Sequence, residues 1–302
     1  MHLNIFVSQK CFLYCKGCYS VSREEECGKF VSTDKIVEFL KFAYNKGVRK
    51  VTLCGGDPLT RKDIIELLEQ IKKIGFSISL DTVGTSIIKN FEINGQVIVK
   101  QTDAQKIAKL VDVIGIPIDG STNEIFKQFR QTTADIINEQ LSVCEELHKF
   151  GANICINTVV HKGNLADSYE LSKLIKKLDY INKWQMFQFA PLGKYGLRNK
   201  ELFEISDEQF LNFKSDVMNT FGNDTDKLQF KDSHTRNKAY MLIDNSGDAW
   251  IQSYKNDSSD DNVNKLNERT IIGNIANSED WNKICTYLQK DSLNNDLEKV
   301  LV

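Results

Sequence analysis

Short runs of alternating apolar residues recur along the sequence, and stretches with helical periodicity separate them. Strands are predicted over 3–9, 48–54, 76–81, 111–118, 153–160 and 184–190, and helices over 32–45, 61–74, 133–150 and 165–178. This rhythm is typical of parallel strands joined by helical crossovers. Because there are six strands rather than eight, we expect an α/β protein built as an open, partial (β/α)6 barrel.

Two departures from this rhythm predict the domain organisation. Asn94-Gly95 separates two β-prone runs within 91–99, which indicates an inserted β-hairpin. Beyond residue 195 the pattern changes to a helix, short strands and a last helix, with a polar loop between the strands. These elements are expected over 207–221, 228–231, 240–243, 249–254 and 271–275, and the loop over 255–269. We expect a core barrel over 1–195 and a small α+β extension over 196–302.

Alternation along the strands predicts which side chains face inward. Ile154 and Ile156 oppose Asn153, Cys155 and Asn157 on the fifth strand. In a barrel the apolar set packs under the helices, and the polar set then lines a wet lumen. The alternative is an ordinary sheet with one face in solvent.

Composition limits the partners and the compartment. The chain has 302 residues, of which 41% are hydrophobic, enough for a substantial core. A net charge of −2 gives no electrostatic signal for nucleic acid. No apolar run approaches the roughly 20 residues needed to span a bilayer, and no export signal is visible at the start. We therefore expect a cytoplasmic protein without a membrane partner, whose eight cysteines are reduced or bound to metal.

Three cysteines stand close together directly after the first strand. Cys11, Cys15 and Cys18 could supply three thiolates to a [4Fe–4S] cluster, which normally takes four, so that one iron keeps an open position for a small molecule. A structural zinc site would need a fourth Cys or His ligand at a suitable spacing. The next histidine, His148, is far downstream. The remaining alternative is that these are small buried residues spaced so by chance.

The spacing C-x3-C-x2-C, followed by Tyr19, resembles the signature of the radical S-adenosylmethionine (SAM) superfamily. The resemblance implies a radical SAM barrel, a [4Fe–4S] cluster held by Cys11, Cys15 and Cys18, and SAM chelated by the open iron. It also implies a flavodoxin- or ferredoxin-type electron donor. One electron would cleave SAM to methionine and a 5′-deoxyadenosyl radical.

Further motifs of this sequence are similar to the SAM-binding turns of that superfamily. Gly55-Gly56-Asp57-Pro58 resembles the GGEP-like turn that holds the SAM amino group, with Asp in place of Glu. Asp119 lies in a stretch similar to Ser-Leu-Asp-Gly, but Pro117 stands where the Ser would be. Arg130 resembles an arginine that pairs with the SAM carboxylate. The residues that the resemblance assigns to cofactor binding are Tyr19, Gly55, Gly56, Asp57, Pro58, Thr82, Asp119, Arg130 and Asn157.

The substrate class rests on the later part of the chain. The stretches 184–193 and 240–247 resemble peptide-modifying members that carry a SPASM-type region. This resemblance implies a peptide substrate. The auxiliary-cluster cysteines are missing, since Gln252 and Ser253 stand where one is expected, so we expect a single cluster. The runner-up is a viperin-like enzyme that modifies nucleotides, although Cys155 stands where those enzymes offer a phosphate-binding lysine.

Two hypotheses that do not involve radical SAM chemistry remain. One is an iron–sulfur electron carrier or sensor, which needs no substrate cavity. The other is a Rossmann-type nucleotide binder, but the sequence lacks G-x-G-x-x-G after the first strand. Cys155 is a candidate catalytic residue, because a thiol in the lumen could donate a hydrogen atom to a substrate radical. The simpler alternative is a small buried cysteine with a packing role.

Overall fold

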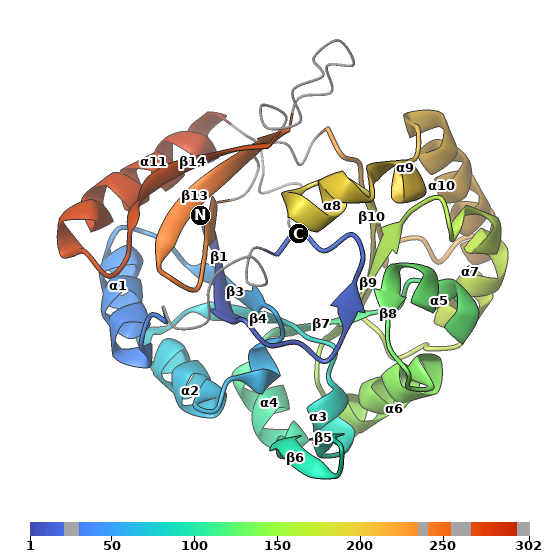
Figure 1. Ribbon diagram of the computed structural model, residues 1–302, viewed down its shortest axis with the longest axis horizontal. Coiled ribbons are helices and arrows are strands. Elements are labelled where there is room, and N and C mark those ends of the chain that lie inside the picture. The colour runs from blue at the N-terminus through green and yellow to red at the C-terminus, as the bar shows by residue number, and fades with distance from the viewer. Residues whose placement is uncertain (21–29, 235–240, 255–266, 295–302) are drawn as a thin grey trace. The chain divides into compact units, whose positions relative to one another are not determined.

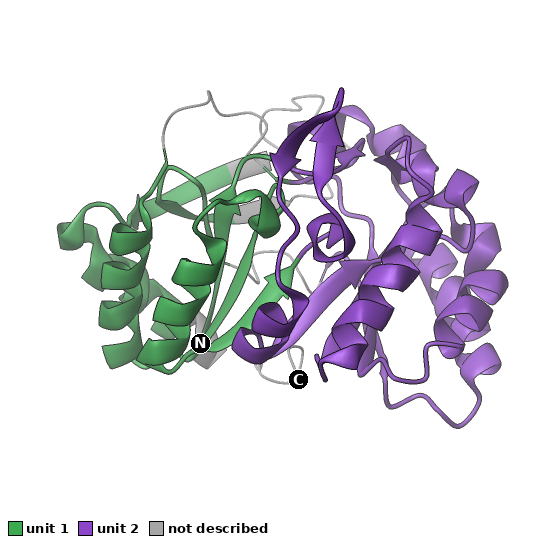
Figure 2. Cartoon of the chain, turned by 90° about the horizontal axis from the view of Figure 1, so that it is seen from below, with its two compact units in different colours: residues 1–10, 20–81, 236–302 green, residues 11–19, 82–235 purple. Residues whose placement is uncertain are grey.

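The computed structural model describes residues 1–20, 30–234, 241–254 and 267–294. They form two compact units, shown in green and purple in Figure 2. Unit 1 comprises 1–10, 20–81 and 236–302, and unit 2 comprises 11–19 and 82–235. Residue 240 and 255–266, which include most of the predicted polar loop, lie outside the described residues.

Unit 1 contains a mixed sheet made from three separate parts of the chain. Its strands are β1 (His2–Ser8), β3 (Lys50–Gly55), β4 (Ser77–Asp81), β12 (Met241–Ile243), β13 (Asp248–Tyr254) and β14 (Asn267–Asn274). Their order is β4-β3-β1-β12-β13-β14, and Figure 1 labels each of these strands except β12. β4, β3, β1 and β12 are parallel, whereas β13 and β14 run antiparallel to their neighbours. The first strand therefore lies between an early strand and a very late one.

Helices α1 (Thr33–Asn45), α2 (Ile64–Ile74) and α11 (Trp281–Asn294) complete unit 1, together with single 3₁₀ turns at Pro58–Thr60 and Ser278–Asp280. α1 begins where the hydroxyl of Ser32 accepts the Lys35 N–H, a standard N-cap. Trp281 packs against two rings of α1, Phe39 and Phe42, at centroid distances of 6.0 and 5.5 Å. These aromatic contacts join the last described helix to the first.

Unit 2 contains four parallel strands in the order β7-β9-β10-β11. They span Val113–Pro117, Ile154–Val160, Lys183–Gln188 and Leu228–Lys231. The helices are α3 (Thr85–Ile88), α4 (Ala104–Leu110), α5 (Asn123–Phe129), α6 (Ile136–Lys149), α7 (Ser168–Lys176), α8 (Gly193–Arg198), α9 (Lys200–Phe203) and α10 (Asp207–Phe221), with a 3₁₀ turn at Leu165–Asp167. Two short strands, β2 (Tyr14–Cys15) and β8 (Arg130–Gln131), pair separately from the four-stranded sheet.

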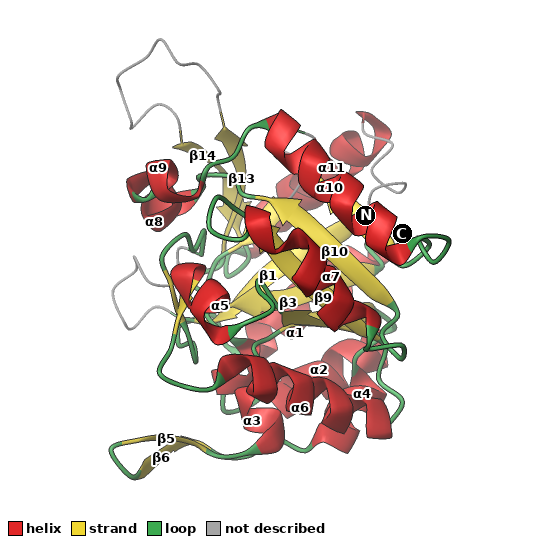
Figure 3. Ribbon diagram, turned by 90° about the vertical axis from the view of Figure 1, so that its right-hand side faces the viewer, coloured by secondary structure: helices red, strands yellow, loops and turns green. Residues whose placement is uncertain are grey.

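The predicted insertion is present in unit 2 as a hairpin of β5 (Phe91–Ile93) and β6 (Gln96–Val99), which projects beside α3 (Figure 3). Asn94 and Gly95 form its turn with φ values of 50° and 76°. Both values lie in the left-handed region that Asn and Gly adopt most readily, which is why this dipeptide predicts the turn.

Side chains alternate on the strands of unit 2 as the sequence predicts. Ile154 and Ile156 are fully buried, while Asn157 on the opposite face is half-buried. On β10 the buried ring of Trp184 meets Phe221 of α10 at 5.6 Å between centroids. One face of the sheet thus packs under helices and the other carries polar residues. That the polar face lines a lumen stays a prediction.

The predicted strands and long helices are found with shifts of up to four residues at their ends, and two elements, α10 and β11, have the predicted bounds. The largest shift is in β14, which begins at Asn267, inside the stretch predicted as a loop. The short helices α3, α4, α5, α8 and α9 were not predicted. Each has seven residues or fewer, so the apolar period is too short to detect. The predicted boundary between a core at 1–195 and an extension at 196–302 stays a prediction.

Candidate cluster and cofactor site

The three clustered cysteines lie in one segment of unit 2, at 11–18. Cys15 pairs with Arg130 in the antiparallel ladder of β2 and β8. Lys16 donates its N–H to the carbonyl oxygen of Phe129 at 2.9 Å, and the N–H of Cys18 donates to the carbonyl of Cys15 at 3.4 Å. Main-chain bonds to β8 and α5 therefore hold the middle of the segment.

A glycine allows this segment to lie flat against aromatic rings. A Cβ atom on Gly17 would stand 2.3 Å from Cε2 of Phe129 and 2.8 Å from Cε2 of Phe189. Such separations are far below van der Waals contact, so no other residue fits between the second and third cysteine without moving these rings. Asn199 secures the same turn by donating from Nδ2 to the Lys16 carbonyl at 2.8 Å.

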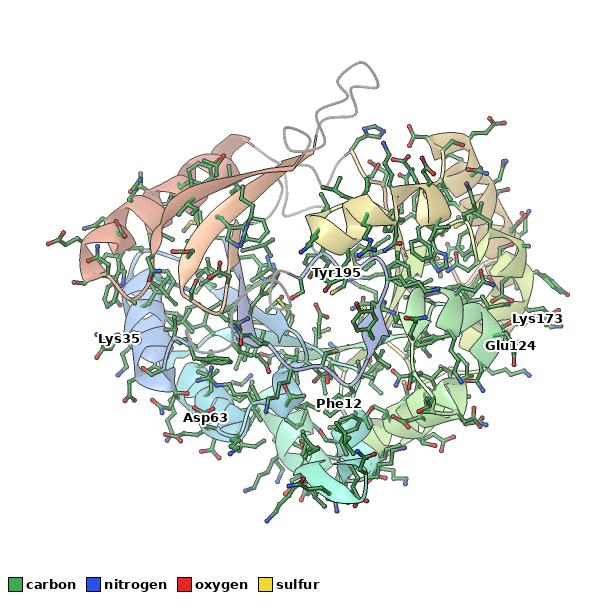
Figure 4. The ribbon with its side chains drawn as sticks, in the orientation of Figure 1. Phe12, Lys35, Asp63, Glu124, Lys173 and Tyr195 are labelled. Carbon is green, nitrogen blue, oxygen red and sulfur yellow. The ribbon has the colours of Figure 1, made fainter. Side chains whose placement is uncertain are left out.

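Helix α8 borders the segment on another side. The rings of Tyr14 and Tyr195 meet edge to face at 6.0 Å between centroids, and Figure 4 labels Tyr195. A Cβ atom on Gly193, where φ is 67°, would stand 2.9 Å from the carbonyl oxygen of Tyr19. Tyr19 itself is 44% exposed.

The donor set fits an iron–sulfur cluster better than a single metal ion. Cys15 is buried, Cys11 and Cys18 are half-buried, and no disulfide joins any of the seven described cysteines. Across the described ranges, no three His, Cys, Asp or Glu side chains converge closely enough to bind one metal ion. In a cubane cluster each thiolate binds a different iron, so the sulfurs need not converge on one point.

Arg130 provides a positive charge beside these thiols. Its Nε donates to Oδ2 of Asp119 at 2.5 Å, and Nη2 donates to Oδ1 at 3.3 Å. Burial lowers the pKa of Arg130, but the charges of Asp119, Cys15 and Cys18 raise it, and the net pKa is above the usual value. Arg130 therefore stays a cation beside Cys15 and Cys18.

Two residues that were predicted to bind SAM, Asp119 and Arg130, contact each other. Asp119 is fully buried, and its Oδ1 also accepts the Val159 N–H at 2.8 Å. The resemblance assigns the Arg130 guanidinium to the carboxylate of SAM. In the structure, this guanidinium is bound by the carboxylate of Asp119. Asn164 secures the same loop by donating from Nδ2 to the Asp119 carbonyl at 2.8 Å.

Thr82 begins a turn at the start of α3, also in unit 2. Its Oγ1 accepts the Gly84 N–H at 3.0 Å, and its own N–H donates to the carbonyl of Gly115 at 3.0 Å. Gly84 has a φ of 78°, and a Cβ atom there would lie 2.6 Å from Cγ1 of Val143. Thr82 is almost fully buried, so the hydroxyl supports the turn from inside.

Cys155 and Asn157 occupy the polar face of β9, as the alternation predicts. The Cys155 thiol donates to Oδ1 of Asn157 at 3.6 Å, a normal distance for sulfur. Cys155 is 3% exposed, whereas Asn157 is half-buried. The thiol is therefore shielded from bulk water but lies on the face that carries the other polar residues.

The turn at 55–58 belongs to unit 1. Gly56 donates its N–H to the Ser8 carbonyl and Asp57 donates to the Lys10 carbonyl, both at 2.6 Å. A Cβ atom on Gly56 would stand 2.2 Å from that Lys10 oxygen. Asp57 is buried and caps the following 3₁₀ turn, which contains Pro58, by accepting the Leu59 N–H at 2.9 Å. The glycine thus permits close approach to the residues just before Cys11.

Sequence reasoning missed His161, which supports the cysteine segment from behind. Its ring stacks on Phe129 at 5.0 Å and meets Phe203 edge to face at 5.3 Å. Burial lowers its pKa to about 4; Arg130 also lowers it, while Asp119 raises it. Nδ1 accepts the Gly163 N–H at 3.0 Å, so the neutral ring carries its proton on Nε2. No motif distinguishes this histidine, since its role arises from contacts with Phe129.

No helix in the described part of the chain is long and apolar enough to cross a bilayer.

Comparison with known families and curated proteins gives a consistent result. The model of the radical SAM superfamily matches residues 5–175. An S-adenosylmethionine-dependent nucleotide dehydratase of Lacinutrix mariniflava is 24% identical over 258 residues, which cover 81% of this chain and 49% of the relative. A GTP 3′,8-cyclase of Aliarcobacter butzleri is 26% identical over 229 residues, 72% of this chain and 66% of the relative. The chain thus spans about half the length of the first relative and two thirds of the second.

Solved structures share the fold at low sequence identity. Streptococcus suis SuiB bound to the precursor peptide SuiA has a TM-score of 0.64 at 17% identity, covering 88% of this chain and 64% of SuiB. The enzyme anSMEcpe with bound AdoMet and the Cp18Cys peptide has a TM-score of 0.64 at 16% identity, covering 96% and 83%. The prediction of an α/β fold built as a partial (β/α)6 barrel is confirmed by this likeness.

Proposed function

The chain belongs to the radical SAM superfamily, and on this premise we propose that it abstracts a hydrogen atom from a peptide substrate. Members of the superfamily are enzymes, which sets aside the electron carrier, the sensor and the Rossmann-type binder. The cofactors are a [4Fe–4S] cluster and SAM. When bound, they supply the reductive cleavage of SAM that yields the 5′-deoxyadenosyl radical.

We assign the cluster to Cys11, Cys15 and Cys18. The main support for this assignment is the packing at Gly17. The segment contacts the rings of Phe129 and Phe189 there so closely that no side chain fits at this position. A rigid loop presents its thiols in one arrangement before the cluster binds. Arg130 adds a positive charge beside Cys15 and Cys18.

We assign SAM binding to Gly55, Gly56, Asp57 and Pro58 through main-chain groups, and to Tyr19, Thr82, Asp119, Arg130 and Asn157 in unit 2. Asp119 acts within this set as a positioning residue, because its buried carboxylate orients Arg130. A flavodoxin- or ferredoxin-type protein would supply the electron. The cytoplasm is the compartment that this oxygen-sensitive chemistry suits. Residues 196–302 would form an extension to the core barrel at 1–195.

The peptide assignment draws support from the shared fold of SuiB and anSMEcpe, whose structures contain peptides. A nucleotide substrate is the second candidate, favoured by the dehydratase and cyclase relatives. Anaerobic reconstitution followed by measurement of 5′-deoxyadenosine tests both. SAM cleavage should rise with an added substrate peptide, or with GTP or CTP for the second candidate. A cluster-loaded, reduced protein that forms no 5′-deoxyadenosine under any of these conditions would contradict the proposed function.

A further inference from the structure

The inserted hairpin of unit 2 is not part of the candidate site. Among the described residues its strands β5 and β6 pair only with each other, as a separate two-stranded sheet. Each strand therefore keeps one edge that no other described strand covers, and such an edge presents main-chain N–H and carbonyl groups to its surroundings. The hairpin projects from unit 2 beside α3, so a partner can approach it (Figure 3).

The surface of this hairpin is apolar for an exposed strand pair. Ile93, Val97 and Ile98 are 51%, 42% and 41% exposed. Natural proteins protect an exposed strand edge with proline, lysine or other charged residues. In contrast, 91–99 contains one charged residue, Glu92, and no proline. A two-stranded hairpin is also only marginally stable in water, and a third strand would stabilise it. The exposed apolar strands thus indicate a surface that another strand covers.

The base of the hairpin contacts the cysteine segment. Phe91 of β5, which pairs with Val99 of β6, meets the ring of Phe12 edge to face at 5.0 Å between centroids. Phe12, labelled in Figure 4, is buried and directly follows Cys11. Strands of three and four residues extend about 10–14 Å. A chain that lies along the hairpin from its turn to its base would therefore arrive beside the cysteine segment.

We propose that the β5–β6 hairpin binds an extended, apolar segment of the substrate peptide, which adds to it as a third strand. Main-chain hydrogen bonds to the free edge would hold this segment, and the side chains of Ile93, Val97 and Ile98 would pack against its apolar residues. This inference rests on the proposed function, since it assigns a recognition surface to the same peptide substrate.

The size of the hairpin favours a peptide over a second copy of this chain. A stable pair of proteins buries roughly 1,200–2,000 Å² of surface. Strands of only three and four residues do not supply such an area by themselves. A peptide needs a smaller contact here, because its reacting residue would bind beside the cluster and the two contacts reinforce each other.

Binding of a short peptide to the cluster-loaded protein tests the proposal without turnover. The probe is the fluorescein-labelled hexapeptide Lys-Val-Thr-Val-Thr-Lys, whose β-branched residues favour an extended strand. We expect it to bind in a fluorescence-polarisation titration. The triple variant Ile93→Thr/Val97→Thr/Ile98→Thr keeps β-prone residues but loses apolar surface. It should bind the probe about tenfold more weakly or worse.

Two comparisons separate strand addition from non-specific contact. The hexapeptide Lys-Val-Pro-Val-Pro-Lys should bind the unchanged protein more weakly than the first probe, because proline has no N–H to donate to a strand edge. The variant Tyr169→Gln/Leu211→Gln/Met218→Gln changes three exposed apolar residues of α7 and α10 instead. It should bind the first probe as the unchanged protein does.

Four results would overturn the proposal: no binding of the first probe, equal binding by the hairpin variant, equal binding of the two probes, or equal losses in the hairpin and helix variants. A dimer of the unchanged protein that dissociates in the hairpin variant would also overturn it, since the hairpin would then pair with a second copy. SAM cleavage without probe binding would overturn this inference alone. Probe binding without SAM cleavage would contradict the proposed function alone.

Discussion

Arg130 and Asp119 form a two-point ion pair in which the carboxylate is fully buried and the arginine side chain is 17% exposed. The pair joins the loop after β7 to β8, the strand that pairs with β2 and its Cys15. A buried charge that loses its partner destabilises a fold strongly. The pair therefore couples the stability of unit 2 to the position of the cysteine segment.

Arg130→Met should consequently lower the free energy of unfolding by about 3 kcal/mol, since it leaves the Asp119 carboxylate buried without its cation. Chemical denaturation of the cluster-loaded protein measures this. The double variant Arg130→Met/Asp119→Leu should recover part of the loss, because no unpaired charge remains. Lys149→Met, which removes an exposed i,i+3 pair with Glu146, should leave the transition unchanged. Equal effects of Arg130→Met and Lys149→Met would contradict the structural role of the buried pair.

Replacing Cys11, Cys15 or Cys18 with Ala should abolish SAM cleavage and leave the scaffold folded. Iron analysis after anaerobic reconstitution should find about four irons per chain in the unchanged protein. Cys144→Ala is the control, because Cys144 is buried within α6 and burial raises its pKa to about 12. This variant should keep its iron. A content of about eight irons, or of one zinc, would refute a single cluster.

Gly56→Ala should weaken SAM binding and also reduce iron loading. The added Cβ would stand 2.2 Å from the Lys10 carbonyl, so the main chain just before Cys11 must shift. Titration of SAM and iron analysis measure the two effects. Gly151→Ala is the control: it meets no atom within 4 Å, although φ is 72°, so its strain is local. If Gly56→Ala bound SAM and iron normally, the turn would have no part in the site.

The buried His161 predicts a pH dependence of stability. Its pKa is lowered from 6.5 to about 4, so the unfolded chain binds a proton below pH 6.5 while the folded chain does not. The contribution of the neutral His161 ring to the free energy of unfolding is fully present above pH 6.5 and is lost as the pH falls toward 4. It amounts to on the order of 3 kcal/mol.

Unfolding of the protein and of His161→Gln should be compared at pH 7, 6 and 5. The cluster's own sensitivity to acid is common to both proteins and cancels in the difference. The stability of the unchanged protein should fall more steeply than that of the variant. Parallel curves would show that His161 titrates normally in the folded state.

Cys155→Ala tests hydrogen-atom donation. If the Cys155 thiol quenches a substrate radical, the variant should still form 5′-deoxyadenosine with substrate but give altered products. It should also deliver no deuterium from heavy water, because the exchangeable thiol is gone. Mass spectrometry of the product measures both. Normal product at the normal rate, with the normal isotope pattern, would leave Cys155 with a packing role.

The sequence predicts those strands, helices and turns that have a pattern of neighbouring residues of their own. Alternation identifies β9, and Asn94-Gly95 identifies the hairpin because only these residues readily adopt its turn angles. Helices as short as α5 and α8 give no such period, and both border the cysteine segment. Contacts there depend on chain segments that come together only in the fold.

Contacts within the candidate site could not be predicted for the same reason. The resemblance assigns Gly56 to the SAM-binding turn, but the sequence does not show that a side chain there would meet the Lys10 carbonyl oxygen. The pair of Arg130 with Asp119 and the stacking of His161 on Phe129 follow from tertiary packing. No spacing along the chain encodes them, whereas the spacing of three cysteines in one loop can be read directly.

The parallel pairing of β1 with β12 has a consequence for synthesis. Asn4 lies opposite Leu242, so the first strand gains this neighbour only after some 240 residues have been translated. At roughly 5–20 residues per second this delay is on the order of 10–50 s. During that interval one edge of β1 is open on the nascent chain, and the cysteines follow directly behind it. An open strand edge can pair with another chain, so β1 is exposed to such pairing on this side until β12 has been made.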